Sequence, residues 1–373
     1  KGKAGFLLIS KFAPNKGEPK IELWDLNLQK LIRNYDIDFE SIRRGLKNSN
    51  LKKFWSHPFL NPDGSMLLTR VGGWNGSIVK VDKCGKYLSH NSELKYHHSI
   101  EADKDGNIYA PIREATISLE KSLHSEDFKD DGFAILDNNL NILKKYSLLE
   151  IYEKEGLLAD IYGKNGFNND PFHLNDVLPY KRDDGTKIVL LSLRNQSSLI
   201  AYDLSEEKII WKIERATMLQ HDVDIISEGD QNIDISIFDN NTYDYLEPRS
   251  KGNEVVIFRN LPTRVEKGFK LIGDKYQHKK FSMQRISFTE IDKKYQPVTL
   301  TAGRSDLIKA NKSVMIEESN FGRLVEIDLE NKEILWQYVN KKGPKELPFL
   351  LSWSRRYETL PFNIKNNFFN KCN

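Results

Sequence analysis

Three short polar clusters hold the residues of this chain that could do chemistry. They read Phe172-His173-Leu174-Asn175-Asp176, Ser192-Leu193-Arg194-Asn195-Gln196-Ser197 and Gln220-His221-Asp222. Each cluster stands beside a short apolar run that is typical of a buried strand, at 188–193, 198–202 and 209–213. Two histidines, an arginine and an asparagine therefore recur at predicted strand ends, and the rest of the chain is expected to bring those ends together.

Two chemistries suit such a set of side chains. Several neutral imidazoles can bind a transition metal. Alternatively, imidazoles, an amide and a guanidinium can hold an oxyanion while one imidazole acts as the nucleophile. Arg194 argues against the metal, because a guanidinium keeps its positive charge and repels a cation. The same residue favours a sulfate or phosphate ester as substrate, with no metal and no cofactor.

A repeated phrase indicates how the strand ends are positioned. It consists of a histidine, a short strand, an Asp-Gly-type hairpin turn and a second strand, and copies begin at His57, His98, His173 and His221. Two of the three intervals fit a four-stranded propeller blade of roughly 40–50 residues. The longer interval carries an insertion at 148–162 whose apolar spacing is helical.

Blade counting predicts about six blades and an all-β, six-bladed β-propeller. Further blades are expected to begin near Pro297 and at the strand around Trp353, the latter completed by the N-terminal strands at 5–37, so that no sheet edge stays free. Residues 1–373 would then form a single domain. Long loops are expected near 240–252 and 262–279, which are polar and aperiodic.

In a propeller, blade-opening residues gather at one mouth of the central channel. His57, His98, His173 and His221 are therefore expected to converge. A purely structural role is the better interpretation for His57, because a repeat histidine can simply hydrogen-bond within its blade. The irregular neighbours of the others favour function, because a structural repeat tends to place similar residues in every blade.

Composition excludes several partner classes. With Lys+Arg 56 against Asp+Glu 53, the net charge is +3, so neither nucleic acid nor an anionic membrane surface is an expected partner. No run of 18 apolar residues is present, so no transmembrane segment is expected. Cys84 and Cys372 are the only cysteines and could be paired or free. The chain begins at Lys1, so an export signal or anchor could precede it.

The motifs resemble those of the bacterial arylsulfate sulfotransferases, which do not use the sulfonucleotide PAPS. The resemblance extends over 55–353 and is carried by the three clusters above, by His97-His98-Ser99-Ile100, by Phe238-Asp239-Asn240 and by the segment 321–328. It implies a six-bladed propeller that moves a sulfuryl group from an aryl sulfate donor to a phenol acceptor through a sulfohistidine intermediate. It also implies a periplasmic or otherwise exported protein.

The resemblance assigns roles residue by residue. His221 resembles the nucleophile, and His98, His173, Asn175 and Arg194 resemble the sulfuryl-binding set. Asp222 or a backbone carbonyl could hold the second ring nitrogen of His221 and fix its tautomer. His98 and His173 are expected to bind sulfate best when protonated.

Two departures from the family leave questions open. No counterpart of the family's N-terminal β-domain is present, which leaves the oligomeric state open, and Ser99 stands where acidic residues are common, which leaves the orientation of His98 open. Two other functions are considered. One is a non-catalytic binding or scaffold propeller. The other is a quinoprotein dehydrogenase, suggested by hairpins that run from Asp203 to Trp211 and from Asp328 to Trp336, although the chain is short for eight blades and lacks vicinal cysteines.

Overall fold

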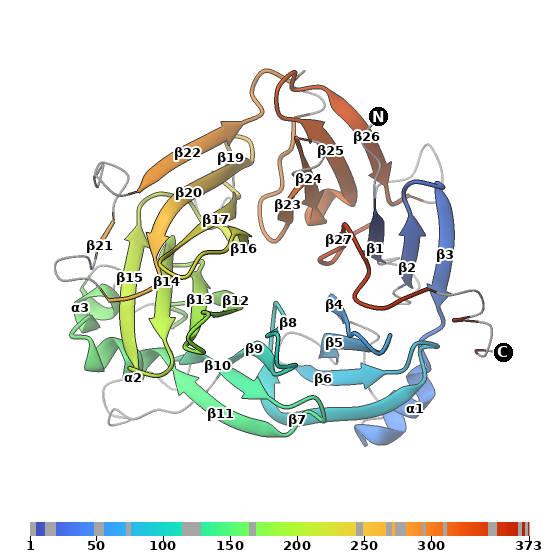
Figure 1. The fold of residues 1–373 in the computed structure, drawn as a ribbon, viewed down its shortest axis with the longest axis horizontal. Helices are drawn as coiled ribbons and strands as arrows, with labels where there is room; N and C mark the ends of the chain where they lie inside the picture. Colours follow the sequence, from blue (N-terminus) through green and yellow to red (C-terminus); the bar gives the residue numbers. More distant parts are fainter. Residues whose placement is uncertain are drawn as a thin grey trace. The chain divides into compact units, whose positions relative to one another are not determined.

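The structure, a computed structural model, divides into two compact units. Unit 1 comprises residues 1–100 and 302–373, and unit 2 comprises residues 101–301. The residues that the structure describes are 5–11, 20–47, 56–71, 76–113, 128–163, 169–243, 249–265, 271–272, 281–291, 293, 296–308, 312–341, 349–364, 368–369 and 372. Both units are built mainly from antiparallel strands, which Figure 1 labels.

Unit 1 consists of antiparallel sheets with one α-helix in its described part, α1 (Phe39–Gly45). Its strands are β1 (Phe6–Lys11), β2 (Lys20–Asp25), β3 (Lys30–Tyr35), β4 (Ser56–Leu60), β5 (Met66–Val71), β6 (Gly76–Val81), β7 (Tyr87–Tyr96), β23 (Arg304–Ile308), β24 (Ser313–Glu318), β25 (Arg323–Asp328), β26 (Ile334–Val339) and β27 (Arg355–Tyr357). Strands β4 to β7 pair in chain order, and so do β23 to β26. A 3-10 turn, η3 (Ser319–Phe321), connects β24 to β25.

The remaining sheet of unit 1 joins segments from both ends of the chain, in the order β27-β1-β2-β3. Strand β1 is antiparallel to β27, with Leu7 opposite Arg356. The N-terminal strands therefore share a sheet with the strand that follows Trp353. That strand begins at Arg355, and Leu351 makes only an isolated bridge to β1. A disulfide between Cys84 and Cys372 also holds the C-terminal segment, which settles the open pairing of the two cysteines.

Unit 2 is continuous in sequence and contains the strands that carry the candidate site. These are β8 (Glu101–Ala102), β9 (Ile108–Arg113), β10 (Asp131–Leu136), β11 (Ile142–Ser147), β12 (Leu174–Lys181), β13 (Lys187–Leu193), β14 (Ser198–Asp203), β15 (Lys208–Glu214), β16 (His221–Ser227), β17 (Asn232–Asp239), β18 (Thr242–Tyr243), β19 (Arg249–Ser250), β20 (Glu254–Pro262), β21 (Leu271–Ile272) and β22 (Ser282–Ser287). Strands β8 to β11 pair in chain order, β12 to β15 likewise, and a further sheet has the order β16-β17-β20-β22. The repeated antiparallel meanders of the two units make the fold all-β and propeller-like.

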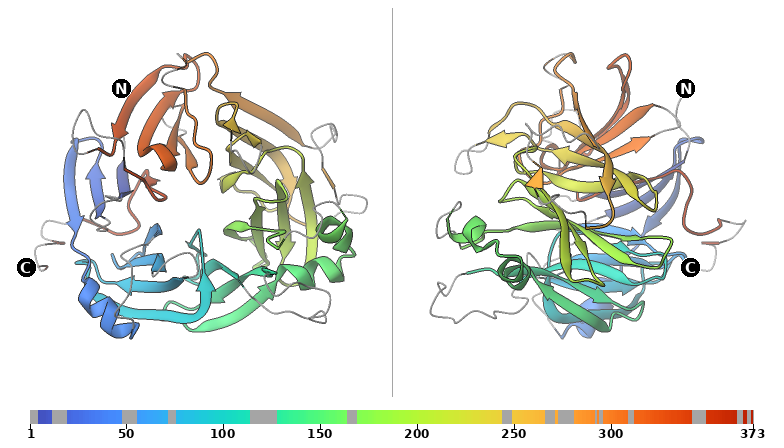
Figure 2. Two further views of the ribbon diagram at one scale, coloured as in Figure 1. Left: turned by 180° about the vertical axis from the view of Figure 1, so that it is seen from behind. Right: turned by 60° about the vertical axis from the view of Figure 1, so that its left-hand side comes forward.

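Two helices occupy the segment whose spacing predicted a helix. They are α2 (Leu148–Lys154) and α3 (Leu158–Tyr162), and they lie against the sheet β12–β15 in Figures 1 and 2. Ser147 caps α2, because its hydroxyl accepts from the Glu150 amide. Lys212 of β15 is buried and pairs with Asp160 of α3 at 2.5 Å, which ties the helices to the sheet.

The two predicted loops differ in part from the structure. The segment 240–252 contains a short antiparallel pair, β18 with β19. Two local hydrogen bonds hold this pair: the Lys251 amide donates to the Asn241 carbonyl, and the Ser250 hydroxyl donates to the Asn240 carbonyl. In the segment 262–279, Pro262 ends β20, and 271–272 form a short strand parallel to β15. Residues 244–248, 266–270 and 273–279 lie outside the described residues.

The predicted Asp-Gly turns are present. Gly64 and Gly185 have φ of 81° and 87°, a left-handed conformation that glycine adopts without the clash of a Cβ atom. Gly64 also has a packing constraint, because a Cβ there would lie 2.5 Å from the Phe368 ring. The turns therefore set the register of the hairpins as the sequence indicated.

Buried carboxylates tie the start of one sheet to its neighbour. In unit 2, Asp131 accepts from the Leu174 amide at 2.8 Å and Asp176 accepts from the Val223 amide at 2.9 Å. In unit 1, Glu317 accepts from the Trp353 amide at 2.8 Å. These bonds satisfy backbone amides at or near strand starts, and they fix where those residues lie.

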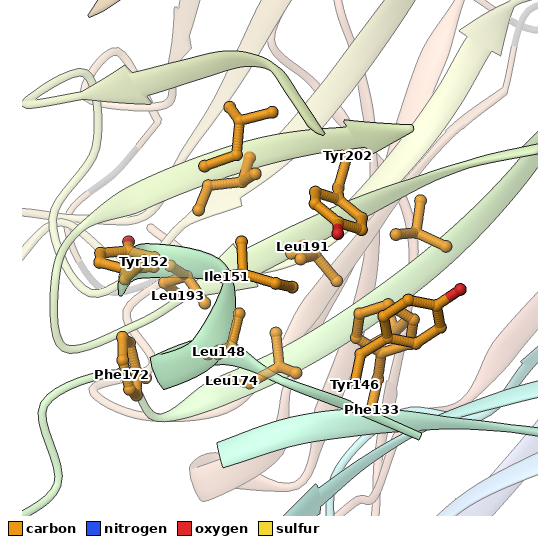
Figure 3. Close-up of a cluster of buried hydrophobic side chains, with 14 of the residues drawn as sticks. Phe133, Tyr146, Leu148, Ile151, Tyr152, Phe172, Leu174, Leu191, Leu193 and Tyr202 are labelled. Carbon is orange, nitrogen blue, oxygen red and sulfur yellow. The ribbon is translucent and has the colours of Figure 1, made fainter. Parts of the chain in front are cut away.

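The largest side chains of the insertion fill a core between α2 and the sheet. Figure 3 shows Leu148, Ile151 and Tyr152 packed against side chains of β12 and β13 and beside the stacked rings of Phe133 and Tyr146. Burial of one such side chain contributes about 1.5–3 kcal/mol to folding. The insertion is thus part of the unit 2 core, and it supports the strand ends that carry the site.

Candidate functional site

His221 is the first residue of β16, and its partner is Asn240. The side chain is almost fully buried, and its Nδ1 lies 2.6 Å from Oδ1 of Asn240. The Asn240 amide nitrogen donates to the Thr299 carbonyl at 3.2 Å, so its oxygen is the atom turned toward the imidazole. Because that oxygen can only accept, Nδ1 carries the proton and Nε2 carries the lone pair.

The sequence suggested Asp222 or a backbone carbonyl as the partner of the ring. The Leu219 backbone does hydrogen-bond to His221, and an amide that the sequence did not suggest, 19 residues further along the chain, holds Nδ1. Asn240 lies in a motif that the sequence did single out, Phe238-Asp239-Asn240, but pairing it with His221 requires the register of β16 against β17. In that register His221 lies opposite Phe238, which places Asn240 just beyond the end of the ladder.

Burial lowers the pKa of His221 to about 3. The positive charge of Arg194 and the neighbouring imidazole of His173 lower this pKa further, while hydrogen bonding to Asn240 and to the Leu219 backbone opposes the shift. His221 is therefore neutral at pH 7, as expected for a nucleophile that needs a lone pair.

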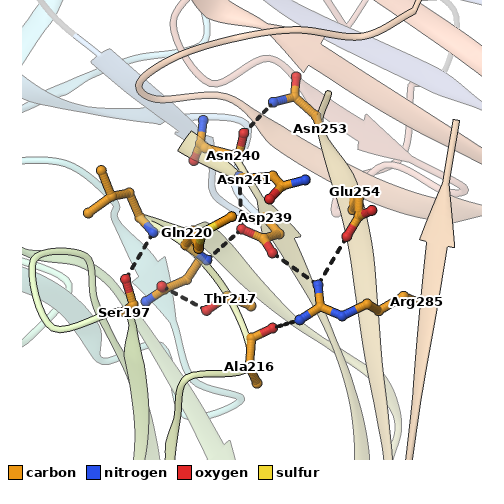
Figure 4. Close-up of polar contacts among 12 residues, drawn as sticks. Ser197, Ala216, Thr217, Gln220, Asp239, Asn240, Asn241, Asn253, Glu254 and Arg285 are labelled. Carbon is orange, nitrogen blue, oxygen red and sulfur yellow. Dashed lines mark hydrogen bonds and ion pairs between the residues drawn. The ribbon is translucent and has the colours of Figure 1, made fainter. Parts of the chain in front are cut away.

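A polar network fixes the two segments on either side of this pair (Figure 4). The Asp239 carboxylate accepts from the Met218 amide at 2.8 Å and from the Asn241 amide at 2.9 Å. Arg285 pairs with Asp239 at 3.2 Å and with Glu254 at 3.0 Å, and it also donates to the Ala216 carbonyl. The network thus holds the backbone next to both His221 and Asn240.

Gln220 and Asn175 attach the start of β16 to the preceding sheet. The Gln220 amide nitrogen donates to the carbonyls of Leu193 and Ser198, at the two ends of the β13–β14 turn. Asn175, fully buried, donates from Nδ2 to the Gln220 carbonyl at 2.8 Å. Asn175 therefore has a positioning contact of its own, and its predicted contact with substrate stays a prediction.

Arg194 lies in that turn, directly after β13. Its backbone amide donates to the His173 carbonyl at 3.2 Å, and its Nη1 donates to Oδ1 of Asn195 at 2.9 Å. Asn195 in turn donates to the Asp170 carbonyl at 2.6 Å. The charge of Arg194 lowers the pKa of both His173 and His221, so the guanidinium is within electrostatic reach of both rings.

His173 precedes β12 in a left-handed conformation, with φ of 50°. Its Nδ1 lies 2.8 Å from Oδ2 of Asp170, and Nη2 of Arg113 lies 3.4 Å from the same nitrogen. Burial lowers the pKa of His173, as do Arg194 and Arg113, while Asp170 raises it. His173 is thus neutral at pH 7, whereas the sequence-based expectation was that it binds sulfate best when protonated.

Asp170 and Arg113 were not predicted from the sequence. Asp170 precedes His173 by three residues within 169–173, and Arg113 ends β9. No periodic pattern marks either residue. An Asp three residues before a functional histidine was the one available signal for Asp170.

Unit 1 contains the other predicted histidines. Nδ1 of His98 lies 2.8 Å from Nδ1 of His97, so one of the two nitrogens donates and the other accepts. The His57 ring stacks on Trp353 with centroids 3.9 Å apart, and the His98 ring meets His57 edge-on at 6.1 Å. This stacking agrees with a structural role for His57.

Unit 2 therefore brings together His173, Arg194, His221 and Asn175, and unit 1 holds His98. A guanidinium beside two neutral imidazoles can bind an anion and can supply a nucleophilic nitrogen. Among the described residues, no group of three or more His, Cys, Asp or Glu side chains is arranged to hold a metal ion.

Comparison with known proteins gives a family and a fold. A sequence model described as arylsulfotransferase (ASST) matches residues 57–341. A Bacteroides caccae protein of unknown function has a similar structure, with a TM-score of 0.50 and 11% identity over 94% of this chain and 98% of that one. The Cps50 (Swd1) beta-propeller domain of Myceliophteria thermophila gives a TM-score of 0.47 and 10% identity over 93% of this chain and 88% of that one. At such identities a structural likeness concerns the fold alone.

No curated protein matches the sequence. In the described part of the chain, no helix is both long enough and apolar enough to cross a membrane.

Proposed function

The chain belongs to the arylsulfotransferase (ASST) family, and from this premise we propose that it moves a sulfuryl group from an aryl sulfate to a phenol through a sulfohistidine at His221. Membership supports a sulfotransferase activity in general. The observation that carries the finer proposal is the hydrogen bond from Nδ1 of His221 to Asn240, which leaves the lone pair on Nε2 of a neutral ring near Arg194.

In the first half of the proposed reaction, Nε2 of His221 attacks the sulfur of the donor. The N–S bond forms while the S–O bond to the aryl oxygen breaks, and the phenol leaves. Arg194 binds the sulfuryl oxygens, whose negative charge its guanidinium matches, and His173 donates to them when it is protonated. An aryl sulfate carries a single negative charge, so this set needs no metal ion to neutralise it.

In the second half, a phenol attacks the sulfur of the sulfohistidine. The S–O bond to the acceptor forms, the N–S bond breaks, and His221 recovers its lone pair. The two halves share one site in turn, which predicts ping-pong kinetics. His98 and Asn175 are assigned to the sulfuryl-binding set by the resemblance alone.

The test uses mass spectrometry and one matched pair of variants. Wild-type protein given 4-nitrophenyl sulfate without acceptor, at mildly alkaline pH, is expected to gain one SO3 group on the peptide that holds His221. His221→Asn keeps the approximate shape and one hydrogen-bonding group, so it is expected to bind donor and to lose turnover by several orders of magnitude.

The control is His90→Asn. His90 lies in β7 and hydrogen-bonds the Tyr87 hydroxyl, so this variant removes a histidine without touching the proposed nucleophile. A label on another residue, or near wild-type turnover by His221→Asn, would contradict the assignment. Donor binding without turnover in the wild type would favour the alternative function, a non-catalytic propeller that binds sulfate esters.

We also propose six blades closed by the N-terminal strands. The pairing of β1 with β27 supports this arrangement, and an experimental structure with β1 and β27 in different sheets would contradict it. Export from the cytosol is supported by the disulfide between Cys84 and Cys372, since structural disulfides persist in oxidising compartments. Cell fractionation with thiol labelling tests the location.

A further inference from the structure

The two histidines of unit 2 have unlike partners. Nδ1 of His221 meets an amide oxygen, that of Asn240, at 2.6 Å, whereas Nδ1 of His173 meets a carboxylate oxygen, that of Asp170, at 2.8 Å. Both partners accept the Nδ1 proton, so in both rings Nε2 is the remaining basic nitrogen. Only the carboxylate can also stabilise a second proton on the ring, because only it carries a negative charge.

Asp170 is built into the site. It is mostly buried, and its backbone carbonyl accepts from Asn195, whose own Oδ1 accepts from Arg194. The carboxylate is therefore placed by the same turn that places the sulfuryl-binding guanidinium. A change in the position of one would be transmitted to the other through a single asparagine.

Charged groups surround His173 from each element packed against it. Arg113 of β9 lies 3.6 Å from Asp170 and 3.6 Å from Asp131 of β10, and Lys129 lies 3.7 Å from Asp170. Arg194 and His221 contribute from the β13–β14 turn and from β16. Burial, Arg194 and Arg113 all favour neutral His173, and Asp170 is the group that opposes them. A bound sulfate monoanion would act in the same direction as Asp170.

We propose that Asp170 is a positioning residue that makes His173 the proton carrier of sulfuryl transfer. This inference rests on the proposed function. In the first half, protonated His173 gives its Nε2 proton to the departing aryl oxygen as the S–O bond breaks, and a neutral phenol leaves. In the second half, neutral His173 takes the proton of the attacking phenol at Nε2 as the new S–O bond forms. The proton released in one half is thus recovered in the other.

The two histidines take different roles because their environments differ. Paired titratable groups in other enzymes likewise serve one as acid and one as nucleophile, according to their surroundings. His221 is kept neutral by an amide and can attack. His173 is held by a carboxylate and can alternate between its two protonation states.

The test compares donors that differ in their need for a proton. The leaving group of 4-nitrophenyl sulfate is a weakly basic phenolate that departs unprotonated, whereas that of phenyl sulfate is strongly basic. In Asp170→Asn, the single-turnover rate of SO3 transfer to His221 is expected to change only a few-fold with 4-nitrophenyl sulfate. With phenyl sulfate it is expected to fall by roughly 10²- to 10³-fold, within the range for loss of general acid catalysis.

Lys129→Gln is the matched control. It removes a half-exposed cation from the same carboxylate but leaves the bond between Asp170 and His173 in place, so the ratio of the two donor rates should stay near that of the wild type. Equal losses with both donors in Asp170→Asn would show a merely structural role and overturn the proposal.

A second measurement needs no variant and keeps the proposal testable should Asp170→Asn not fold. In the wild type, the first-half rate with phenyl sulfate should fall as pH rises, while that with 4-nitrophenyl sulfate should not. The second-half rate should rise with pH. Parallel pH profiles for the two donors would refute the role of His173. Absence of any SO3 label on wild-type His221 would instead refute the underlying function, so the two failures are distinguishable.

Discussion

The protonation of His221 can be tested by acidification. Burial lowers the pKa of this ring to about 3. At pH 5 a histidine with the ordinary pKa of about 6.5 would be only about 3% neutral, whereas one with a pKa near 3 would be about 99% neutral. The structure therefore predicts about a 30-fold difference in the availability of the Nε2 lone pair at that pH.

The assay is a histidine-ring NMR titration of 15N-labelled protein between pH 8 and pH 4. The His221 signals are identified by their absence from His221→Asn. They are expected to show the tautomer with the proton on Nδ1, as the bond to Asn240 requires, and to stay unshifted through pH 6.5. A midpoint near 6.5 in the folded protein, or a proton on Nε2, would refute the reasoning.

Stability gives an independent check with a defined sign. The folded-state pKa of His221 lies below the unfolded-state value, so the unfolded chain binds more protons between about pH 3 and pH 6.5, and acidification through this window favours unfolding. From a pKa of about 3, the loss at pH 5 relative to pH 8 is about 2 kcal/mol. His221→Asn should lose about that much less than the wild type over the same interval, as measured by urea unfolding at both pH values.

Two further predictions concern charge and covalent linkage. Arg194→Leu, made in the His221→Asn background to prevent turnover, is expected to weaken aryl sulfate binding by about 1.5–3 kcal/mol, because a charge-assisted contact is lost. Calorimetry measures this loss. The control is Arg259→Leu, which removes an exposed arginine paired with Asp234 and should leave aryl sulfate binding unchanged. The double variant Cys84→Ser with Cys372→Ser should unfold at lower urea concentration than the wild type. The linkage spans 288 residues, for which the chain-entropy model gives about 6 kcal/mol, and an unchanged midpoint would contradict it.

Local signals in the sequence were sufficient for much of the fold. An Asp-Gly pair between two apolar runs predicts a hairpin because the turn needs a left-handed residue, and Gly64 and Gly185 supply it. Helical spacing at 148–162 predicted α2 and α3 for a similarly local reason. Polar histidine clusters at strand ends also pointed to the elements that carry the candidate site.

The partners of the site residues were harder to predict. The bond from His221 to Asn240 depends on the register of two strands, and the bond from His173 to Asp170 depends on the course of a short aperiodic segment. A one-residue slip in either place would bring a different side chain to the ring. Sequence patterns specify which face of a strand is buried, but they do not specify which polar atom meets a given nitrogen at a strand end.

The pairing of β1 with β27 has a consequence for the order in which the chain can fold. Residues 101–301 form a unit that is continuous in sequence, so its strands can pair while the chain is still being synthesised. The sheet β27-β1-β2-β3 must wait, because β1 is made before residues 101–301 and β27 is made after them. During that interval β1 is an unpaired edge of the kind that pairs with foreign strands. The interval most exposed to aggregation is therefore expected to end only when β27 docks and the bond between Cys84 and Cys372 can form.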